Sequence, residues 1–432
     1  MIDTKEFKFY PFSLGCKVNG YETSAVGEGL REKGFLKAES PEEADVIILN
    51  TCGVTARADQ KSRQHISRFR NANPKACLLV MGCYSQANAE TAASLGADIV
   101  LGSSEREEAV PLILDYLADH KKRILIHSSV RHEAYDELGT VAVTEAARAY
   151  LKIQDGCDNF CSYCMIPQLR GNSRSRSPID VIREAKALTT DGYKEIVITG
   201  IHVGGYGKDL SDGSYRLSDL LRQLLMECPS LYRLRVSSIE ESEIDDGFLS
   251  LLRDFPNLAD HLHIPLQSGS SSILKLMKRK YDTKAFLDKL ARIRQVRPEI
   301  AITTDVIAGF PTETEEHWKE TVAFCREANF AEIHVFPFSS RPGTYASTLP
   351  DVDPQTKKER VHELLALSKE LRLDYQKKFY GREMEVLLES EDKEHQRISG
   401  HTSNYLLVSI PSGEKHHGEI QKVIYSPSIA SD

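Results

Sequence analysis

Short apolar runs alternate with amphipathic stretches through the first 120 residues of the chain. The apolar runs predict strands at residues 7–14, 46–50, 77–82 and 97–101, and the amphipathic stretches predict helices near residues 20–33, 60–72, 86–95 and 105–119. This alternation is typical of an open parallel sheet covered by helices. We therefore expect residues 1–120 to form an N-terminal α/β domain.

A second series of strands and helices follows residues 121–146, which lack a clear hydrophobic period and are expected to connect two domains. Its strands are expected at residues 150–154, 195–199, 231–237, 261–266, 301–307 and 332–336, with helices at 179–189 and 283–296. Six such units predict a partial (β/α)6 barrel over residues 147–376. Residues 377–432 have short apolar runs separated by turns, which predict a small antiparallel β domain.

The composition of the chain limits the classes of protein to which it can belong. With 432 residues, 41% of them hydrophobic, the chain can bury more than one core. It has neither a signal peptide pattern nor an apolar run long enough to cross a membrane, so the sequence favours a cytoplasmic protein without a membrane partner. A net charge of −8 argues against coating nucleic acid through overall positive charge.

Local basic patches remain candidates for binding nucleic acid. A solvated helix face or loop explains each of them equally well. The candidates are Lys61, Arg63, Arg68 and Arg70, then Arg170, Arg174 and Arg176, then Lys275, Lys278, Arg279 and Lys280.

The nine cysteines favour metal or redox use over disulfides, because the chain has no secretion signal. Cys16, Cys52 and Cys83 each follow a predicted strand of the N-terminal domain within two residues. The carboxyl ends of parallel strands meet at one edge of a sheet, so the fold is expected to bring these three together. Cys77 begins its strand and is expected at the opposite edge, buried like Cys228 and Cys325, which lie in helical segments.

Cys157, Cys161 and Cys164 lie in one loop that follows the first strand of the expected barrel. A closed zinc site needs four ligands, whereas a four-iron cluster held by three thiolates leaves one iron open to a substrate or cofactor. A zinc or structural site completed by a distant histidine is the alternative.

This Cys-x3-Cys-x2-Cys spacing resembles the signature of radical S-adenosylmethionine (SAM) enzymes, in which SAM chelates the open iron and is cleaved to a 5′-deoxyadenosyl radical. The segments KIQDGC (152–157), RGNSRSR (170–176), IPLQSGS (264–270), LGC (14–16), NTC (50–52) and MGC (81–83) resemble the methylthiotransferase family over nearly the whole chain. The resemblance implies that Cys16, Cys52 and Cys83 bind a second, auxiliary [4Fe-4S] cluster. The chain would then carry two clusters on six cysteines, with residues 147–376 as a radical SAM barrel.

Within that family, CKVNGYET (16–23), TARADQKSRQ (55–64) and TGIH (199–202) resemble the tRNA N6-threonylcarbamoyladenosine methylthiotransferases. The resemblance implies that the enzyme adds a methylthio group to C2 of this base beside the anticodon. It would use SAM once as methyl donor and once as radical source. The implied partners are the tRNA, an electron donor such as flavodoxin or ferredoxin, and a sulfur source.

Relatives with other substrates differ just after Cys16. Enzymes acting on isopentenyladenosine usually have Gln-Met-Asn there, and those acting on a ribosomal-protein aspartate usually have Pro-Lys-Asn or Glu-Lys-Asn. Methylthiolation of isopentenyladenosine tRNA or of a ribosomal-protein side chain is therefore the alternative function within the family.

The resemblance also implies SAM contacts at the ends of the barrel strands. Thr199 and Gly200 are expected near the amino group, Ser237, Ser238 and Gln267 near other polar groups, and Asp305, Gly309 and Phe336 along the adenosine. A capping or packing role is the alternative for each of them. Arg174 and Arg176 suit either the SAM carboxylate or a tRNA phosphate, and the sequence does not choose.

The C-terminal domain is TRAM-like by the same resemblance, which implies RNA binding through basic and aromatic side chains. The expected contacts are Lys378, Arg382, Arg397, His401 and Tyr405. The chain ends soon after Tyr425, where the family often continues with another strand, so the small barrel is expected to be incomplete.

Two other classes of function fit parts of the sequence. A non-catalytic, metal-stabilised RNA-binding protein would form no 5′-deoxyadenosine from SAM. A radical enzyme whose second cluster only relays electrons would release 5′-deoxyadenosine but add no sulfur.

Overall fold

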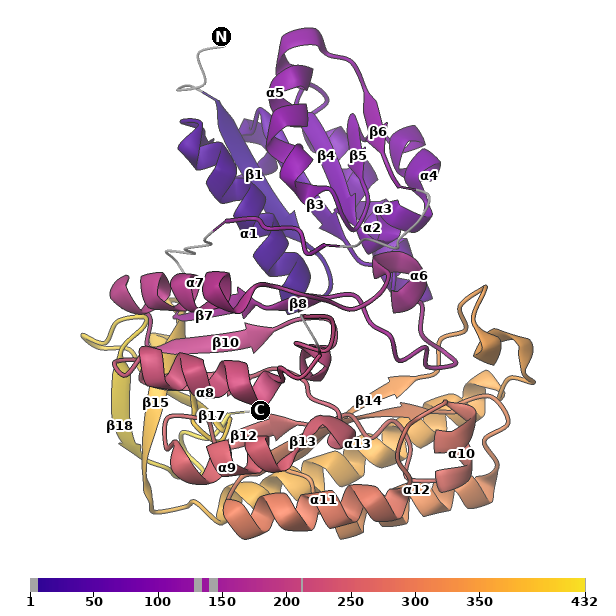
Figure 1. Ribbon diagram of the computed structural model, residues 1–432, viewed down its shortest axis with the longest axis vertical. Helices are drawn as coiled ribbons and strands as arrows, with labels where there is room; N and C mark the ends of the chain where they lie inside the picture. Colours follow the sequence, from indigo (N-terminus) through magenta and orange to yellow (C-terminus); the bar gives the residue numbers. More distant parts are fainter. Residues whose placement is uncertain (1–6, 128–133, 140–146, 211–212, 432) are drawn as a thin grey trace.

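The computed structural model of the protein describes residues 7–127, 134–139, 147–210 and 213–431. Figure 1 shows the N-terminal part above the middle part, and the C-terminal strands (yellow) at one side of the middle part. None of the helices within these ranges combines the length and the apolar character needed to cross a membrane. The N-terminal part is a parallel sheet with strand order β2-β1-β3-β4-β5-β6. Its strands are β1 (Lys8–Ser13), β2 (Leu36–Lys37), β3 (Val46–Thr51), β4 (Cys77–Gly82), β5 (Ile99–Leu101) and β6 (Arg123–Leu125).

Helices cover both faces of this sheet, because β3 and β4 are apolar and buried along their whole length. One face packs against α1 (Lys17–Glu32) and α5 (Ala109–Asp119). The other packs against α2 (Ala56–Ala72) and α4 (Ala89–Ser94), and α3 (Cys83–Ala87) follows β4 directly. The predicted N-terminal α/β sheet is confirmed.

The differences from the sequence prediction lie at the edges of the sheet and at a helix break. The helix expected at 86–95 is two helices, because Asn88 leaves the helical conformation with φ −138°. The edge strands β2 and β6 were not predicted, since they are too short for an alternating pattern. β6 lies within 121–146, which we expected to be a connection. Residues 128–133 and 140–146 of that connection lie outside the described residues.

The middle part is a partial barrel of parallel strands. β7 (Arg148–Lys152), β10 (Glu195–Thr199) and β11 (Arg233–Val236) pair with one another, as do β12 (His261–His263), β13 (Ala301–Ala308) and β14 (Glu332–Pro337). Parallel bridges from Leu234 to Leu258 and from Ser238 to His263 join the two groups. All six strands were predicted from the sequence, and they form the expected partial (β/α)6 barrel.

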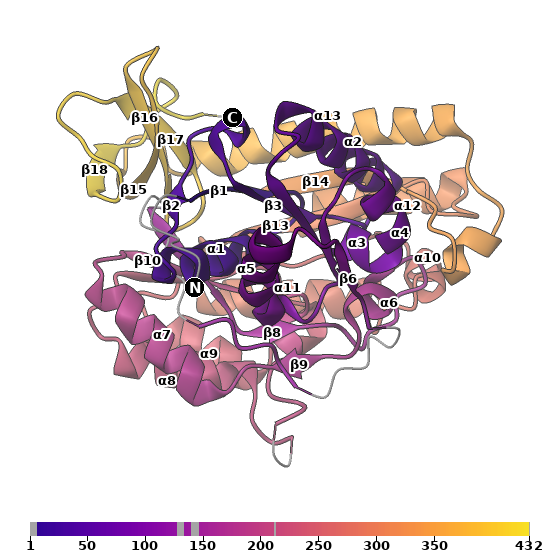
Figure 2. The ribbon, with the colours of Figure 1, turned by 90° about the horizontal axis from the view of Figure 1, so that it is seen from above.

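Helices cover the outside of the barrel (Figure 2). The longer ones are α7 (Pro178–Thr190), α8 (Leu217–Glu227), α9 (Asp246–Asp254), α11 (Thr283–Val296), α12 (Glu315–Ala328) and α13 (Pro354–Lys377). The short elements are β8 (Gln154–Asp155), β9 (Arg174–Ser175), α6 (Ile166–Arg170) and α10 (Ser271–Leu276). Single 3-10 turns occur at Pro41–Glu43, Arg106–Glu108, Val203–Gly205, Glu241–Glu243 and Tyr345–Thr348.

The barrel strands alternate between apolar and polar residues, and the apolar residues pack under the helices. The alternate positions therefore face the inside of the barrel. These inward positions include Glu195, Arg233, Arg235, His261, His263, Thr303, Asp305 and His334. The barrel interior is thus polar and charged, which suits a polar ligand.

The C-terminal part is an antiparallel sheet with strand order β17-β16-β15-β18. Its strands are β15 (Glu383–Asp392), β16 (Arg397–Thr402), β17 (Leu407–Pro411) and β18 (Ile420–Ile424). Ala430 bridges to Val408, and the Ser409 N–H donates to the Ile429 carbonyl at 2.8 Å. The described residues after β18 thus meet β17 only through this bridge and form no further strand, and the expected incompleteness of the domain stays a prediction.

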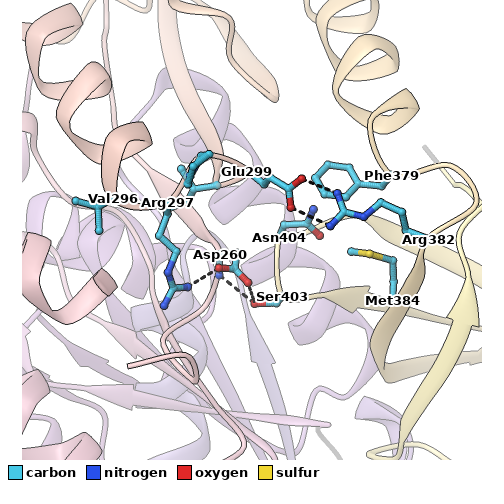
Figure 3. Close-up of a pocket in the computed structure, with 11 residues that line it drawn as sticks. Asp260, Val296, Arg297, Glu299, Phe379, Arg382, Met384, Ser403 and Asn404 are labelled. Carbon is cyan, nitrogen blue, oxygen red and sulfur yellow. Dashed lines mark hydrogen bonds and ion pairs between the residues drawn. The ribbon is translucent and has the colours of Figure 1, made fainter. Parts of the chain in front are cut away.

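This domain closes the barrel at the amino ends of its strands. Figure 3 shows the junction, where Arg382 donates two hydrogen bonds to Glu299 at 2.6 and 2.9 Å and Ser403 donates to Asp260 at 2.8 Å. Tyr405 stacks between His261 and His401, with ring centroids 4.5 and 4.4 Å apart. Tyr405 and His401 were expected to contact RNA, but their rings pack against the barrel instead.

Candidate active site

The first thiol set lies in the loop between β8 and α6. Backbone N–H groups point at two of its sulfurs, from Asn159 to Cys157 at 3.5 Å and from Ile166 to Cys164 at 3.4 Å. The Arg279 guanidinium donates to the sulfur of Cys161 at 3.3 Å. Each of the three sulfurs therefore faces a donor that stabilises a thiolate.

Gly156 shapes the start of this loop. Its φ is +71°, a conformation that favours glycine, and a Cβ there would lie 1.9 Å from the backbone oxygen of Asn172. The neighbouring Cys157 N–H donates to the Gly171 carbonyl at 3.0 Å. The loop is thus held against residues 171–172 with no room for a side chain at position 156.

Gly156→Ala is therefore expected to displace Cys157 and to lower the iron bound by the first thiol set, because both the positive φ and the backbone clash oppose alanine. The measurement is iron content and SAM cleavage after anaerobic reconstitution. Gly192→Ala is the matched control, since Gly192 has φ +93° but a Cβ there would meet no atom within 4 Å. Equal iron loss in both variants would show that backbone strain alone, and not the contact with Asn172, is responsible.

The second thiol set lies at the carboxyl edge of the N-terminal sheet. A Cβ on Gly15 would lie 2.8 Å from the Cβ of Cys52, and a Cβ on Gly53 would lie 3.0 Å from the carbonyl carbon of Cys83. The loops that carry Cys16, Cys52 and Cys83 are therefore in contact. Cys77, Cys228 and Cys325 are buried, as expected.

Asn19 ties these loops together. Its side-chain amide donates to the carbonyls of Leu14 and Thr51 at 2.8 and 3.1 Å, the residues where β1 and β3 end. Its backbone carbonyl accepts from the Asn50 side chain at 3.1 Å. Asn19 was part of the sequence motif, but its structural role becomes visible only in the fold.

Arg170 connects the second thiol set to the barrel. Its Nε donates to the Cys83 sulfur at 3.2 Å, and its two other nitrogens contact Asn19, Glu22 and Asp155 at 2.8 to 3.0 Å. The side chain is fully buried. Arg170 is therefore not part of a basic surface patch, because carboxylates from both domains neutralise it.

A buried network of charged side chains surrounds Arg170 at the junction of the two domains. Lys152 contacts Glu22 at 2.8 Å and Asp155 at 2.7 Å, and Arg106 contacts Glu22 at 3.0 Å. Burial alone would raise the pKa of Asp155, but the positive charges of Arg170, Lys152 and Arg106 hold it well below its usual range. These charges fix the N-terminal sheet against β7 and so place one thiol set relative to the other.

A second contact joins the N-terminal domain to the segment that follows β14, which is the other edge strand of the barrel. Arg341, which follows β14, pairs with Asp59 at 2.8 Å and donates to the Gly53 carbonyl at 2.9 Å. The N-terminal sheet is thus fixed beside both edge strands, β7 and β14, and it lies across the open side of the partial barrel (Figure 1).

Arg174, Arg176 and Arg279 were expected in basic patches or at a bound anion, and the structure places all three inside the protein. Arg176 is buried and pairs with Glu184 and Glu137. Arg174 is buried and donates to the carbonyls of Arg170 and Asn172 at 2.9 and 3.1 Å. We therefore do not propose Arg174 and Arg176 as contacts of SAM or tRNA phosphate.

The residues expected to contact SAM lie around the carboxyl ends of the barrel strands, the end that carries the first thiol set. Thr199 ends β10, and Gly200 packs against Gln154, whose carbonyl would lie 3.0 Å from a Cβ at position 200. Gln267 has φ +71°, and its N–H donates to the Asp305 carbonyl at 2.8 Å. The remaining members of this ring are Ser237, Ser238, Gly309 and Phe336. These residues lie at or next to the carboxyl ends of the barrel strands, and their contacts with SAM stay predictions.

His202 and Glu243 form a pair beside this ring that sequence reasoning did not assign. Their side chains lie 2.6 Å apart and are largely buried. Burial would lower the pKa of His202, but hydrogen bonds with Cys157 and Glu243 raise it to about 10. The histidine thus adds positive charge near the first thiol set. In the sequence, His202 is the last residue of the TGIH motif (199–202), and this motif supported only the family resemblance and not a role for the histidine.

Glu313 supports the backbone of Gly309. The Gly309 N–H donates to its carboxylate at 2.8 Å, and Arg360 contacts the same oxygen at 2.7 Å. Burial nevertheless raises the pKa of Glu313 from 4.5 to about 7. The folded protein therefore holds this proton more tightly than the unfolded chain. The stability that this group contributes is complete below pH 4.5 and is lost as the pH rises through about 7.

Glu313→Gln is expected to remove this pH dependence, because glutamine does not titrate. Relative to wild type, the variant should gain about 2 kcal/mol of stability between pH 5 and pH 8. The measurement is the difference in thermal unfolding midpoint between variant and wild type at both pH values. Glu316→Gln is the control, because Glu316 lies exposed in α12, which begins two residues after Glu313, and its lowered pKa keeps it charged over this range. If the difference in midpoint between Glu313→Gln and wild type is the same at pH 5 and at pH 8, the raised pKa of Glu313 is contradicted.

The two thiol sets fit iron–sulfur clusters better than single ions. No group of three or more His, Cys, Asp or Glu side chains in the described part of the chain is arranged to hold one metal ion. A four-iron cluster needs thiolates spread around a larger core. The first set provides three sulfurs with N–H donors directed at them, and in the second set Arg170 donates to the Cys83 sulfur. Burial raises the pKa of Cys164 to about 12 and of Cys83 to about 11, so cluster binding would release protons from these thiols.

Comparisons with known proteins identify the family of this chain. Residues 8–102 match the model described as uncharacterized protein family UPF0004, and residues 151–325 match that of the radical SAM superfamily. The chain is 43% identical to threonylcarbamoyladenosine tRNA methylthiotransferase MtaB of Bacillus subtilis, over 95% of this chain and 92% of the relative. The chain belongs to the radical SAM methylthiotransferases. It is accordingly an enzyme of that kind, and the family implies a [4Fe-4S] cluster and SAM.

A second relative and one solved structure complete the comparison. The chain is 34% identical to the tRNA-2-methylthio-N(6)-dimethylallyladenosine synthase of Bacillus subtilis, over 96% of this methylthiotransferase and 83% of that relative. The radical SAM methyltransferase TsrM from Kitasatospora setae superposes with a TM-score of 0.61 at 13% identity, covering 79% of this chain and 74% of TsrM. This last likeness concerns the fold alone.

Proposed function

We propose that this methylthiotransferase converts N6-threonylcarbamoyladenosine beside the tRNA anticodon to its 2-methylthio form. The observation that carries the proposal is the 43% identity to MtaB, against 34% to the dimethylallyladenosine synthase of the same organism. The sequence Cys16-Lys17-Val18-Asn19 at the second thiol set supports the same choice.

We propose that Cys157, Cys161 and Cys164 hold the cluster that binds SAM, and that Cys16, Cys52 and Cys83 hold an auxiliary cluster. When bound, SAM would supply the radical and the methyl group of the reaction, and the auxiliary cluster would carry the sulfur that receives the methyl group. The protein's own residues position these groups. Arg279 and Arg170 each donate to one sulfur of a set, and the buried charges around Glu22 and Asp155 join the N-terminal domain to the barrel. The target base must leave its stack to enter between them.

The test uses anaerobically reconstituted protein with SAM, a reductant and three anticodon stem-loop RNAs that carry threonylcarbamoyladenosine, isopentenyladenosine or adenosine. Mass spectrometry of the nucleosides should show a methylthio product from the first RNA alone. A product from the isopentenyladenosine RNA instead would support the alternative tRNA substrate. Failure of all three RNAs, together with methylthiolation of a ribosomal protein, would overturn the proposal in favour of the protein substrate.

A further inference from the structure

Three aromatic side chains in the described part of the chain are largely exposed, and all three lie at the end of the barrel that carries the first thiol set. They are Phe160, Phe336 and Tyr345, which are 57%, 52% and 51% exposed. Phe336 lies near the end of β14, among the residues expected to contact SAM. Neither of the other two rings is part of the small apolar core beneath them. Phe160 also has φ +47°, a backbone conformation that a bulky residue rarely adopts. Packing therefore explains neither Phe160 nor Tyr345, and exposed rings gathered at one end indicate a binding surface.

Backbone hydrogen bonds bring Phe160 and Tyr345 to the same surface. Ser162 lies two residues after Phe160 in the loop of the first thiol set, and its N–H donates to the Met277 carbonyl at 3.1 Å. Its own carbonyl accepts from the N–H of Ala346, the neighbour of Tyr345, at 2.8 Å. Met277 and Ala346 are buried in the same small core. Three segments far apart in the sequence therefore form one rim beside the first thiol set.

This rim also carries positive charge. Lys278 and Lys280 are exposed, and Lys275 is exposed three residues earlier. The ammonium group of Lys278 lies 5.5 Å from the centre of the Tyr345 ring, and that of Lys280 donates to the side-chain oxygen of Asn159 at 2.6 Å. Both contacts are with neutral groups, and neither lysine pairs with a carboxylate within the ranges that the structure describes. The rim thus combines exposed rings with ammonium groups that are not neutralised.

A single-stranded loop of RNA matches this combination. Unpaired bases stack on aromatic rings while their phosphates pair with ammonium groups, so rings and lysines side by side suit unpaired nucleotides. The target base must lie between the two thiol sets, and its neighbours in the anticodon loop then lie beside the first set. The C-terminal domain does not offer its Tyr405 ring for this purpose, because that ring packs against the barrel at the amino ends of its strands.

We propose that an aromatic rim, formed by Phe160, Lys278, Lys280 and Tyr345, binds the unpaired nucleotides of the anticodon loop next to the target base. The rings stack on bases, and the lysines contact phosphates. This inference rests on the proposed function, and it names the surface that holds the RNA while the target base enters between the thiol sets. Because every base has a face to stack on, the rim holds the loop without reading its sequence.

The first experiment tests the rings. It measures by fluorescence anisotropy how tightly the reconstituted protein binds an anticodon stem-loop RNA that carries threonylcarbamoyladenosine. Phe160→Ala and Tyr345→Ala should each weaken binding about tenfold, because each removes one stacking ring. Phe160→Tyr and Tyr345→Phe should keep the wild-type affinity, because each retains the ring. Met226→Ala is the control and should bind as wild type does, since Met226 is 66% exposed on α8, outside the rim.

The second experiment tests the lysines through the salt dependence of binding. Lys278→Met and Lys280→Met should each weaken binding at low salt. Each should also reduce the slope of log affinity against log salt concentration by about 0.7, the value for one phosphate of a single strand. A lysine that only supports the loop would leave this slope unchanged. Lys75→Met is the control, since Lys75 lies exposed before β4 at the amino edge of the N-terminal sheet.

The outcomes separate this inference from the proposed function. If wild-type protein methylthiolates the RNA but the rim variants bind it as tightly as wild type does, the rim is overturned and the function stands. If wild-type protein neither binds nor modifies the RNA, the function is overturned instead. Rim variants that bind RNA normally, but form 5′-deoxyadenosine only with dithionite and not with flavodoxin or ferredoxin, would show that the rim docks the electron donor. That result also overturns the proposal.

Iron content is measured for every variant, because Phe160 adjoins Cys161. If Phe160→Ala loses iron, Tyr345→Ala and the two lysine variants decide the question.

Discussion

Replacing Cys161 with alanine is expected to abolish the formation of 5′-deoxyadenosine, whereas replacing Cys52 should leave SAM cleavage intact and abolish only the methylthio product. The reason is that the two residues belong to separate thiol sets, one in the loop before α6 and one at the edge of the N-terminal sheet. Each variant should retain about four of about eight irons per chain after reconstitution. Iron analysis, together with chromatography of SAM products and modified nucleosides, measures all three quantities.

Cys325→Ala is the control for this pair, because Cys325 is a fully buried thiol in α12 and belongs to neither set. It should retain both clusters and both activities. Retention of 5′-deoxyadenosine formation in Cys161→Ala would contradict the assignment of the first set. Retention of the methylthio product in Cys52→Ala would show that the second set is not required for sulfur transfer.

Lys152→Met is expected to destabilise the folded protein by about 3–5 kcal/mol, because it leaves two buried carboxylates with less compensating charge. Lys152 is fully buried and contacts Glu22 at 2.8 Å and Asp155 at 2.7 Å. The thermal unfolding midpoint should fall by about 10 °C, as measured on the protein without iron so that cluster loss does not contribute.

Lys284→Met is the matched control for this prediction. Lys284 also forms an ion pair, with Asp288 at 2.6 Å, but it lies exposed on α11, where water screens the charges. Its replacement should leave the midpoint unchanged. If Lys152→Met lowers the midpoint no more than Lys284→Met, the buried network does not hold the two domains together.

Much of the fold could be predicted from local patterns. β3 and β4 are continuous apolar runs that are buried along their length, and such runs have few alternatives to a central strand. The long helix α11 was predicted to the residue, because Asp282 caps its first turn and its apolar positions repeat at helical spacing. The edge strands β2 and β6 were not predicted, because a strand of two or three residues is too short to show an alternating pattern of apolar and polar residues.

The arginines near the candidate active site show where the local sequence pattern gives a wrong prediction of burial. Arg170, Arg174, Arg176 and Arg279 look like basic surface patches in the sequence, but each is engaged inside the protein. The partner of Arg170 is Glu22, which lies 148 residues away, and the partner of Arg279 is Glu240, which lies 39 residues away. A single arginine has the same local pattern whether it faces water or a carboxylate from a distant element.

The sequence by itself determined the two sets of three cysteines, since strand ends and close spacing already group them, and it determined the order of the three domains. Only the tertiary structure decided which charges neutralise one another. Burial is a property of the assembled chain, and the energy of an ion pair depends on the distance and the surroundings of its two charges. The same lysine or arginine therefore acquires its role from partners that only folding brings near, as Lys152 and Arg170 show at the junction of the two domains.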